Sequence, residues 1–293
     1  MSKTEHDDVT GIETTGHEWD GIRELNNPLP RWWLWTFYAT VLFAIGYMIY
    51  YPSIPLIEGS TMGISGETNR SILKEEMAAI ERQNAGLREQ LKTTPLADIE
   101  KNEPLFRYAL AGGSSLFKVN CSQCHGSGAQ GAPGYPNLND DDWLWGGDLQ
   151  TIYLSINHGI RNEEDDDART SLMPAFKGVL EPQQIRDVSQ YVISISGRKA
   201  DSATAQRGKA IYDENCASCH GDKGQGLREF GAPKLTDALW LYGMSAAEIT
   251  TQVEKPQHGV MPAWGERLGE AAVKQLALYV YSLGGGEKTE PAE

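Results

Sequence analysis

Cys121-Ser122-Gln123-Cys124-His125 is the stretch that decides how this 293-residue chain is built, and it returns as Cys216-Ala217-Ser218-Cys219-His220. Cys-x-x-Cys-His is the attachment motif of a c-type haem. The two thiols bond covalently to the macrocycle, and the histidine ligates the iron. The chain has 4 cysteines, all of them in these two motifs. The sequence therefore predicts two covalently bound haem c groups, held by Cys121, Cys124, Cys216 and Cys219, with His125 and His220 as iron ligands.

Each motif belongs to a longer repeat. Gly113 and Phe117 precede the first motif at the spacing at which Gly208 and Tyr212 precede the second. Downstream, both copies run to a Met-Pro pair and a closing apolar segment, and the first copy alone carries an insertion at 161–172. The repeat predicts two small haem domains, at 104–198 and 203–286. A dithiol redox or zinc motif, the alternative, explains neither the adjacent histidines nor the repeat.

The closing segments predict helices at about 182–196 and 270–283, because their apolar residues recur at helical spacing. We expect each closing helix to pack against the helix that precedes the Cys-x-x-Cys-His motif of its own copy. Gly-rich and Pro-rich loops would then wrap the haem. Each copy would in this way form a core of its own.

Haem iron in an electron carrier needs a second axial ligand. Met173 and Met261 occupy equivalent positions in the repeat, and each precedes a proline, which restrains the loop that presents the sulfur. We predict both as iron ligands, and a thioether raises the potential relative to a second histidine. His158 and His258 are the alternatives, and they are also equivalent. Their other interpretation is a hydrogen bond to a propionate or to backbone near the haem edge.

The insertion at 161–172 is rich in acidic residues, with five in a row from Glu163 to Asp167. Three interpretations stay open: a docking patch for a basic cytochrome, a weak cation site, or a solvated loop. On a surface, such a patch acts mainly on the rate of encounter with a partner.

The formal net charge is −14, and no segment of the chain is basic. This composition excludes nucleic acid as a partner class. A broadly acidic electron-transfer protein attracts a basic partner. Because covalent haem c is attached outside the cytoplasm in bacteria, we expect the haem domains in the periplasm.

Residues 32–51 form 20 consecutive positions without a charge. As a helix this segment matches the thickness of a bilayer core, so it predicts a transmembrane anchor in contact with lipid. Tryptophans crowd its start and tyrosines its end, as in the aromatic belts of membrane helices. Arg23 and Arg31 precede the span and no Lys or Arg follows until Arg70. The positive-inside rule then places the N-terminus in the cytoplasm of a single-pass protein of the bacterial inner membrane.

The segments on either side of the anchor show weaker sequence signals for structure. Residues 1–31 predict a cytoplasmic tail, partly disordered and without a signal-peptide layout. Residues 52–103 predict a periplasmic linker with a charged helix at 67–92, which is either a stalk that packs on a partner subunit or a solvated amphipathic helix. Residues 287–293 form a polar tail.

Several stretches together resemble one family, over nearly the whole chain. They are the segments 20–22, 26–30 and 32–35 at the anchor entrance, Tyr135 to Leu138, Asp141 to Gly147, both haem motifs and both Met-Pro pairs. This combination is similar to the dihaem cytochrome c subunit, CcoP or FixP, of cbb3-type cytochrome c oxidases. The single anchor is the departure to note, because some members carry two.

The resemblance implies a mainly α fold: one N-terminal transmembrane helix, a helical linker and two tandem class-I-like cytochrome c domains. It also implies a subunit that takes electrons from a soluble cytochrome c or the bc1 complex. The electrons would pass to a monohaem subunit and to the catalytic haem–copper subunit, which reduces oxygen to water, so no catalysis is expected of the isolated chain. A stand-alone membrane-anchored dihaem carrier is the alternative. A dihaem peroxidase would need one iron open to peroxide, whereas both copies keep a Met-Pro pair.

Overall fold

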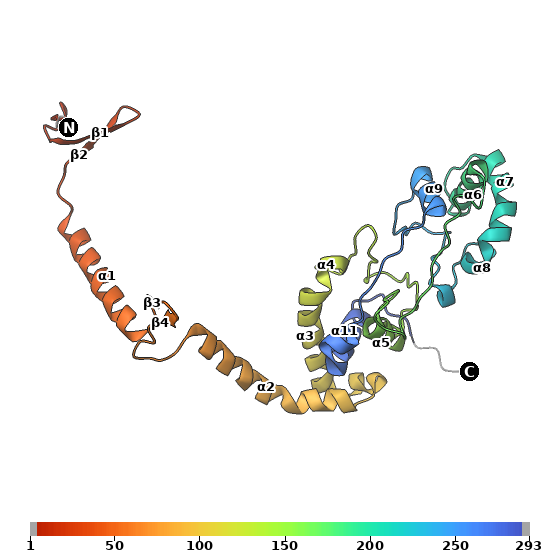
Figure 1. Ribbon diagram of the computed structural model, residues 1–293, viewed down its shortest axis with the longest axis horizontal. Helices are drawn as coiled ribbons and strands as arrows, with labels where there is room; N and C mark the ends of the chain where they lie inside the picture. Colours follow the sequence, from red (N-terminus) through yellow and green to blue (C-terminus); the bar gives the residue numbers. More distant parts are fainter. Residues whose placement is uncertain (1–4, 289–293) are drawn as a thin grey trace. The chain divides into compact units, whose positions relative to one another are not determined.

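The computed structural model describes residues 5–288 as a mainly helical chain with two compact units (Figure 1). The division falls between Gln83 and Asn84, within helix α2 (Asn69–Thr93). The first unit holds the hairpin β1 (Thr14–Trp19) and β2 (Ile22–Leu25), helix α1 (Arg31–Tyr50), and a minimal hairpin of β3 (Pro55–Leu56) and β4 (Gly59–Ser60). The second unit holds both haem motifs.

The β1–β2 hairpin corrects the prediction of a partly disordered tail for this segment. Trp19 pairs with Ile22 across a two-residue turn, Asp20-Gly21, whose φ angles are 51° and 83°. Asp-Gly is a preferred pair for such turns, because both central residues take positive φ. This signal was present in the sequence. Residues 1–4 and 289–293 of the predicted tails lie outside the described residues.

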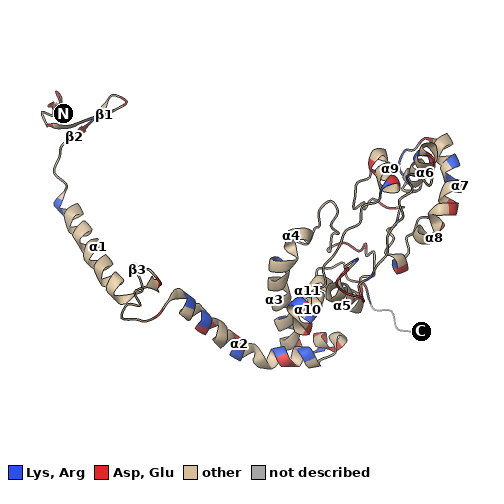
Figure 2. Cartoon of the chain, in the orientation of Figure 1, with Lys and Arg blue, Asp and Glu red and all other residues tan. Residues whose placement is uncertain are grey.

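Helix α1 coincides with the predicted anchor to within one residue at each end. It is 20 residues long, none of its side chains is buried, and it carries no charge after Arg31 (Figure 2). By length and composition it can cross a membrane.

Helix α2 confirms the helix predicted at 67–92, but its last turn packs within this chain, which neither a stalk on a partner subunit nor a solvated helix predicts. Leu91, in the last turn, is fully buried, as is Ile99 in the following 3-10 helix η1 (Leu96–Lys101). Both belong to the core that surrounds the first haem motif. The last part of the predicted linker therefore packs as part of that core.

The second unit carries the repeat twice. Its helices are α3 (Glu103–Asn120), α4 (Ser122–His125), α5 (Leu149–His158), α6 (Pro182–Ile195), α7 (Ser202–Asn215), α8 (Ala217–His220), η2 (Arg228–Phe230), α9 (Ala246–Glu254), α10 (Gly265–Leu268) and α11 (Glu270–Tyr281). Both closing helices, α6 and α11, are confirmed. Side-chain caps start several of the others, with Asp148 accepting from the Thr151 amide and Ser245 from the Glu248 amide.

The closing helices have exchanged places. Helix α11 packs against α3 and α5 of the first copy, whereas α6 of the first copy packs against α7 and α9 of the second (Figure 1). The buried apolar residues form two clusters with the same division. The expectation that each closing helix packs on its own copy is therefore wrong. Because the copies carry equivalent apolar stripes, a closing helix can fill the same place in either core.

Close helix contacts are built alike in the two cores. A Cβ on Gly113 of α3 would overlap the backbone oxygen of Gln275 in α11. A Cβ on Gly208 of α7 would likewise overlap the backbone oxygen of Asp187 in α6. The glycines that the repeat singled out thus allow two helix backbones to meet.

Lys274 joins the end of α2 to the exchanged helix α11. Its Nζ donates to the backbone oxygens of Leu91 at 3.2 Å, Lys92 at 2.7 Å and Thr94 at 3.1 Å, and pairs with Glu270 at 2.8 Å. The residue is only 7% exposed. A cation on the carbonyls that end a helix satisfies groups without an intrahelical partner and complements the helix dipole.

We expect Lys274→Met to lower the free energy of unfolding by about 2–3 kcal/mol, since buried carbonyls lose a charged donor. Lys209→Met is the matched control. Lys209 pairs with Asp213 at 2.5 Å on an exposed face, and its loss should cost less than about 1 kcal/mol. Denaturant unfolding of the full chain in detergent measures both. Equal effects of the two substitutions would contradict the role given to Lys274.

Candidate functional site

The two Cys-x-x-Cys-His motifs have the same local form. In each, a long helix ends at the first cysteine, and the next four residues form a short helix, α4 or α8. Gly126 and Gly221 end these short helices with φ of 81° and 79°, a region that side chains with a Cβ rarely adopt. Each motif is therefore a tight turn at a helix end, with both thiols and the histidine on four consecutive residues.

The motif histidines are held in one tautomer. His125 Nδ1 lies 3.0 Å from the Pro136 oxygen, and His220 Nδ1 lies 3.1 Å from the Pro233 oxygen. A carbonyl only accepts, so Nδ1 must donate the proton, and Nε2 keeps its lone pair. Burial lowers the pKa of both histidines, which favours the neutral ring. Both rings therefore have the state that an iron ligand needs, oriented by a backbone partner.

The surroundings of the motif thiols differ from those of reactive cysteines. Cys124 is exposed and the other three cysteines are half-buried. Burial, with a smaller contribution from the neighbouring cysteine, raises the pKa of Cys121 and of Cys216 to about 11. At neutral pH such thiols are protonated, whereas reactive cysteines have lowered pKa values. This chemistry disfavours the dithiol interpretation and is compatible with covalent haem attachment.

Each predicted methionine lies with the motif of the other copy. Met261 packs with Cys121 against the first core, and Met173 packs with Cys216 against the second. The structure thus brings Met173 to the motif of Cys216, Cys219 and His220, and it places Met261 against the same core as Cys121 of the first motif. This grouping follows from the exchange of closing segments, since each methionine precedes the closing helix of its copy.

A cavity of about 900 Å³ marks the site of the second motif. Cys216, Cys219, His220 and Met173 all line it. Its further apolar lining comes from both halves of the chain and includes Leu144, Pro174, Phe176, Val188, Tyr212, Leu235 and Trp240. The volume is within the range of roughly 300–1,000 Å³ that is typical of ligand sites, and a mostly apolar wall suits a macrocycle. The residues present therefore fit a haem.

The two alternative histidines have different partners. His258 Nε2 accepts a hydrogen bond from the Met173 amide at 3.0 Å. His158 lies with Nδ1 3.1 Å from both carboxylate oxygens of Asp165 and with Nε2 3.0 Å from the Asn157 amide nitrogen. His258 thus has the backbone partner that its second interpretation foresaw. His158 is turned toward the acidic insertion.

The acidic insertion folds back on the first copy. Its Asp165 and Asp167 come close to His158, with potential ligand atoms within 4.8 Å of one another. Glu164 also pairs with Arg267 at 3.5 Å. These contacts show an ordered loop, and docking or cation binding by it stays a prediction.

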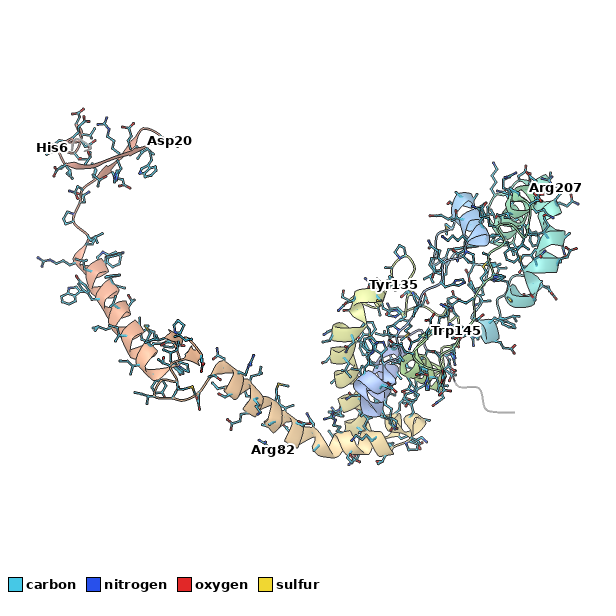
Figure 3. All side chains as sticks on the ribbon, viewed as in Figure 1. His6, Asp20, Arg82, Tyr135, Trp145 and Arg207 are labelled. Atoms are coloured by element: carbon cyan, nitrogen blue, oxygen red, sulfur yellow. The ribbon has the colours of Figure 1, made fainter. Side chains whose placement is uncertain are left out.

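Sequence reasoning missed the contacts between the two copies. Trp145 of the first copy lies where a Cβ on Gly231 of the second would overlap its ring (Figure 3). Trp143 Nε1 donates to the Gly285 oxygen at 2.6 Å, which brings the glycine-rich end of the chain to the first copy. The repeat is the same whether closing helices are exchanged or not, so it holds no signal for these contacts.

Comparison with known families covers most of the chain. Residues 11–58 match the N-terminal domain of cytochrome oxidase-cbb3, FixP. Residues 110–196 match cytochrome c, and residues 203–280 match cytochrome c oxidase, cbb3-type, subunit III.

The chain is 50% identical over 286 residues to the cbb3-type cytochrome c oxidase subunit FixPc of Rhizobium leguminosarum bv. viciae, covering 98% of this chain and 100% of the relative. The chain belongs to the FixP/CcoP family. The family member named CcoP in Cereibacter sphaeroides is 51% identical, over 94% of this chain and 95% of that protein. The CcoP of Azospirillum brasilense is 45% identical, over 98% and 100%.

Membership in the FixP/CcoP family confirms the predicted fold class. The chain is mainly helical, with one N-terminal candidate transmembrane helix and two cytochrome c domains. Cytochrome c domains imply covalently bound haem c. The apolar helix α1 and the family of membrane-complex subunits together indicate a membrane-anchored protein.

Proposed function

We propose that the chain is the dihaem electron-transfer subunit of a cbb3-type oxidase, passing electrons from a periplasmic donor to the oxidase's other subunits. One observation carries the proposal: both motifs present a neutral histidine with a free Nε2, and a methionine of the other copy packs against the same core as the first cysteine of each motif. Two sites in one compact unit suit a relay of single electrons.

The proposed ligand sets are crossed. His125 and Met261 would hold the iron of a haem bound to Cys121 and Cys124. His220 and Met173 would hold the iron of a haem bound to Cys216 and Cys219. When bound, haem c supplies a one-electron carrier whose potential depends on its axial ligands.

Other residues of the chain orient these ligands and line the second site. The Pro136 and Pro233 carbonyls keep the histidine rings in the ligating tautomer. The prolines after the two methionines restrain the loops that carry the sulfur atoms. Apolar side chains from both halves limit the access of water to the second site, which favours the less charged ferrous state.

The proposed topology has the N-terminus in the cytoplasm and both haem sites in the periplasm. Arg23 before α1 and Arg31 at its first position, with no further basic residue before Arg70, support it. The proposed electron donor is a soluble cytochrome c or the bc1 complex, and the net charge of −14 suits a basic donor. The proposed acceptors are a monohaem cytochrome c subunit and the catalytic haem–copper subunit, with lipid around α1.

Purification in mild detergent with haem and metal analysis tests the proposal. We expect two haems c for each copy of the chain, together with b-type haem and copper from co-purifying subunits. A lone chain with two haems c would instead identify a stand-alone carrier. A high-spin resting haem with peroxide turnover would identify a peroxidase. Either of these results would contradict the proposed function.

A further inference from the structure

The two methionine-bearing segments are tied where the chain crosses between the cores. Ile160 and Met261 exchange two backbone hydrogen bonds, each of 3.0 Å. The Met173 amide donates to His258 Nε2, also at 3.0 Å. Each methionine is therefore held by a residue from the other copy.

Arg161, at the start of the insertion, contacts both segments with one side chain. Its Nε donates to the Gly259 oxygen at 2.6 Å, and its Nη1 donates to the Ser171 oxygen at 3.3 Å. Gly259 and Ser171 each stand two residues before a methionine. A planar guanidinium has donors in a fixed geometry, so it holds two carbonyls at a set separation.

The backbone at Arg161 supports a specific role for this side chain. Its φ is 52°, a left-handed conformation that is uncommon for residues other than glycine and asparagine. Such outliers persist where the surrounding structure determines them. The Arg161 amide donates to the Arg169 oxygen at 2.8 Å, which closes the insertion as a loop. The second copy lacks the insertion, so it has no equivalent arginine.

Arg161 is half-buried and lines the cavity of the second motif together with Met173 and His258. Burial lowers its pKa, but a guanidinium stays protonated at neutral pH. Hydrogen bonds from a charged donor in a partly dry site are stronger than neutral ones.

We infer that Arg161 is a positioning residue for both axial methionines, holding the Met173 and Met261 segments together so that one side chain stabilises methionine ligation at both haems. The inference rests on the crossed ligand sets of the proposed function. It predicts that one substitution loosens two sites, whereas replacement of either methionine affects one.

The rate at which cyanide displaces methionine from the ferric haems of the full chain in detergent tests the inference. Loss of the red methionine-to-iron charge-transfer band reports the exchange, which is limited by methionine dissociation at high cyanide concentration. We expect Arg161→Gln to accelerate both kinetic phases by about tenfold, the change that corresponds to one charged hydrogen bond. A merely structural role for Arg161 would leave these rates unchanged.

Arg169→Gln is the matched control. Arg169 is a half-buried arginine of the same insertion, but its side chain bonds to the Trp145 oxygen and the Ser155 hydroxyl and to neither methionine segment. We expect its two rates to match those of the unmodified chain. If Arg161→Gln does not accumulate, Arg161→Lys, which lacks the planar fork, serves for the same measurement.

Acceleration of one phase only, or of neither, would overturn the inference. Failure of methionine ligation looks different: Met173→Ala and Met261→Ala would then leave the band intact in the absence of cyanide. The two outcomes therefore separate an error about Arg161 from an error about the ligands.

Discussion

Met261→Ala is expected to remove the methionine ligand from the haem at Cys121 and Cys124, and to leave the haem at the second motif unchanged. The reason is the exchange of closing segments, which packs Met261 with Cys121 and Met173 with Cys216. The uncrossed assignment, in which each copy supplies its own methionine, predicts the opposite result. The effect should be complete loss of the red charge-transfer band of one haem, because no second sulfur replaces the one removed.

Chains with a single haem give the cleanest measurement. The pair Cys216→Ser and Cys219→Ser leaves only the first motif able to bind haem. In that background we expect Met261→Ala to abolish the band and Met173→Ala to preserve it. The pair Cys121→Ser and Cys124→Ser should reverse the two outcomes.

Retention of the band after Met261→Ala in the first background, with its loss after Met173→Ala, would mean that the ligand sets are not crossed. Where single-haem chains do not accumulate, redox titration of the two-haem chain tests methionine ligation itself, without assigning each methionine to a motif. Each methionine substitution should then lower one of the two reduction potentials, because a thioether favours ferrous iron.

Gly113→Ala is expected to destabilise the protein by about 1–3 kcal/mol, the usual cost of overpacking a tight contact. The added Cβ would overlap the backbone oxygen of Gln275 and approach the Tyr279 Cβ at 2.6 Å. Neither group moves without a shift of α11 away from α3. Because α11 follows Met261, the shift should also weaken methionine ligation at the first motif.

Gly112→Ala is the matched control, one residue earlier in the same helix. Its Cβ would meet the side-chain amide of Gln275, which can rotate away. Alanine also gains up to about 1 kcal/mol over glycine in a helix interior, so this change should be close to neutral. Denaturant unfolding of the ferric chain, followed by the red band, compares the two variants. Equal tolerance of both changes would show that α3 and α11 do not meet as described.

Local features were predictable where the signal lies within a few residues. Polar caps, the uncharged run of the anchor and the apolar stripes of the closing helices each depend on neighbouring positions, and all the corresponding helices are present. The β1–β2 hairpin belongs to the same class, but its Asp20-Gly21 turn was overlooked. The expectation of partial disorder at this hairpin was an error of interpretation, because the sequence held the signal.

The contacts of the equivalent histidines were beyond sequence reasoning. His158 and His258 stand at matching positions of the repeat, yet one lies beside Asp165 and the other accepts from the Met173 amide. The difference arises because the insertion supplies a carboxylate to the first histidine only. His258 contacts a segment of the other copy, and no pattern in the neighbouring sequence predicts a contact between such distant segments.

By itself, the sequence determined that this chain carries two haem c motifs and that one helix can anchor it in a membrane, and it predicted which residue types ligate the iron. The tertiary structure alone decided which methionine lies with which motif. The physical reason is the repeat: α6 and α11 bury similar apolar faces, and Gly113 and Gly208 offer the same close contact to either. Local preferences therefore cannot distinguish the two pairings. The choice depends on the packing of the whole unit, in which both closing helices pack on the other core.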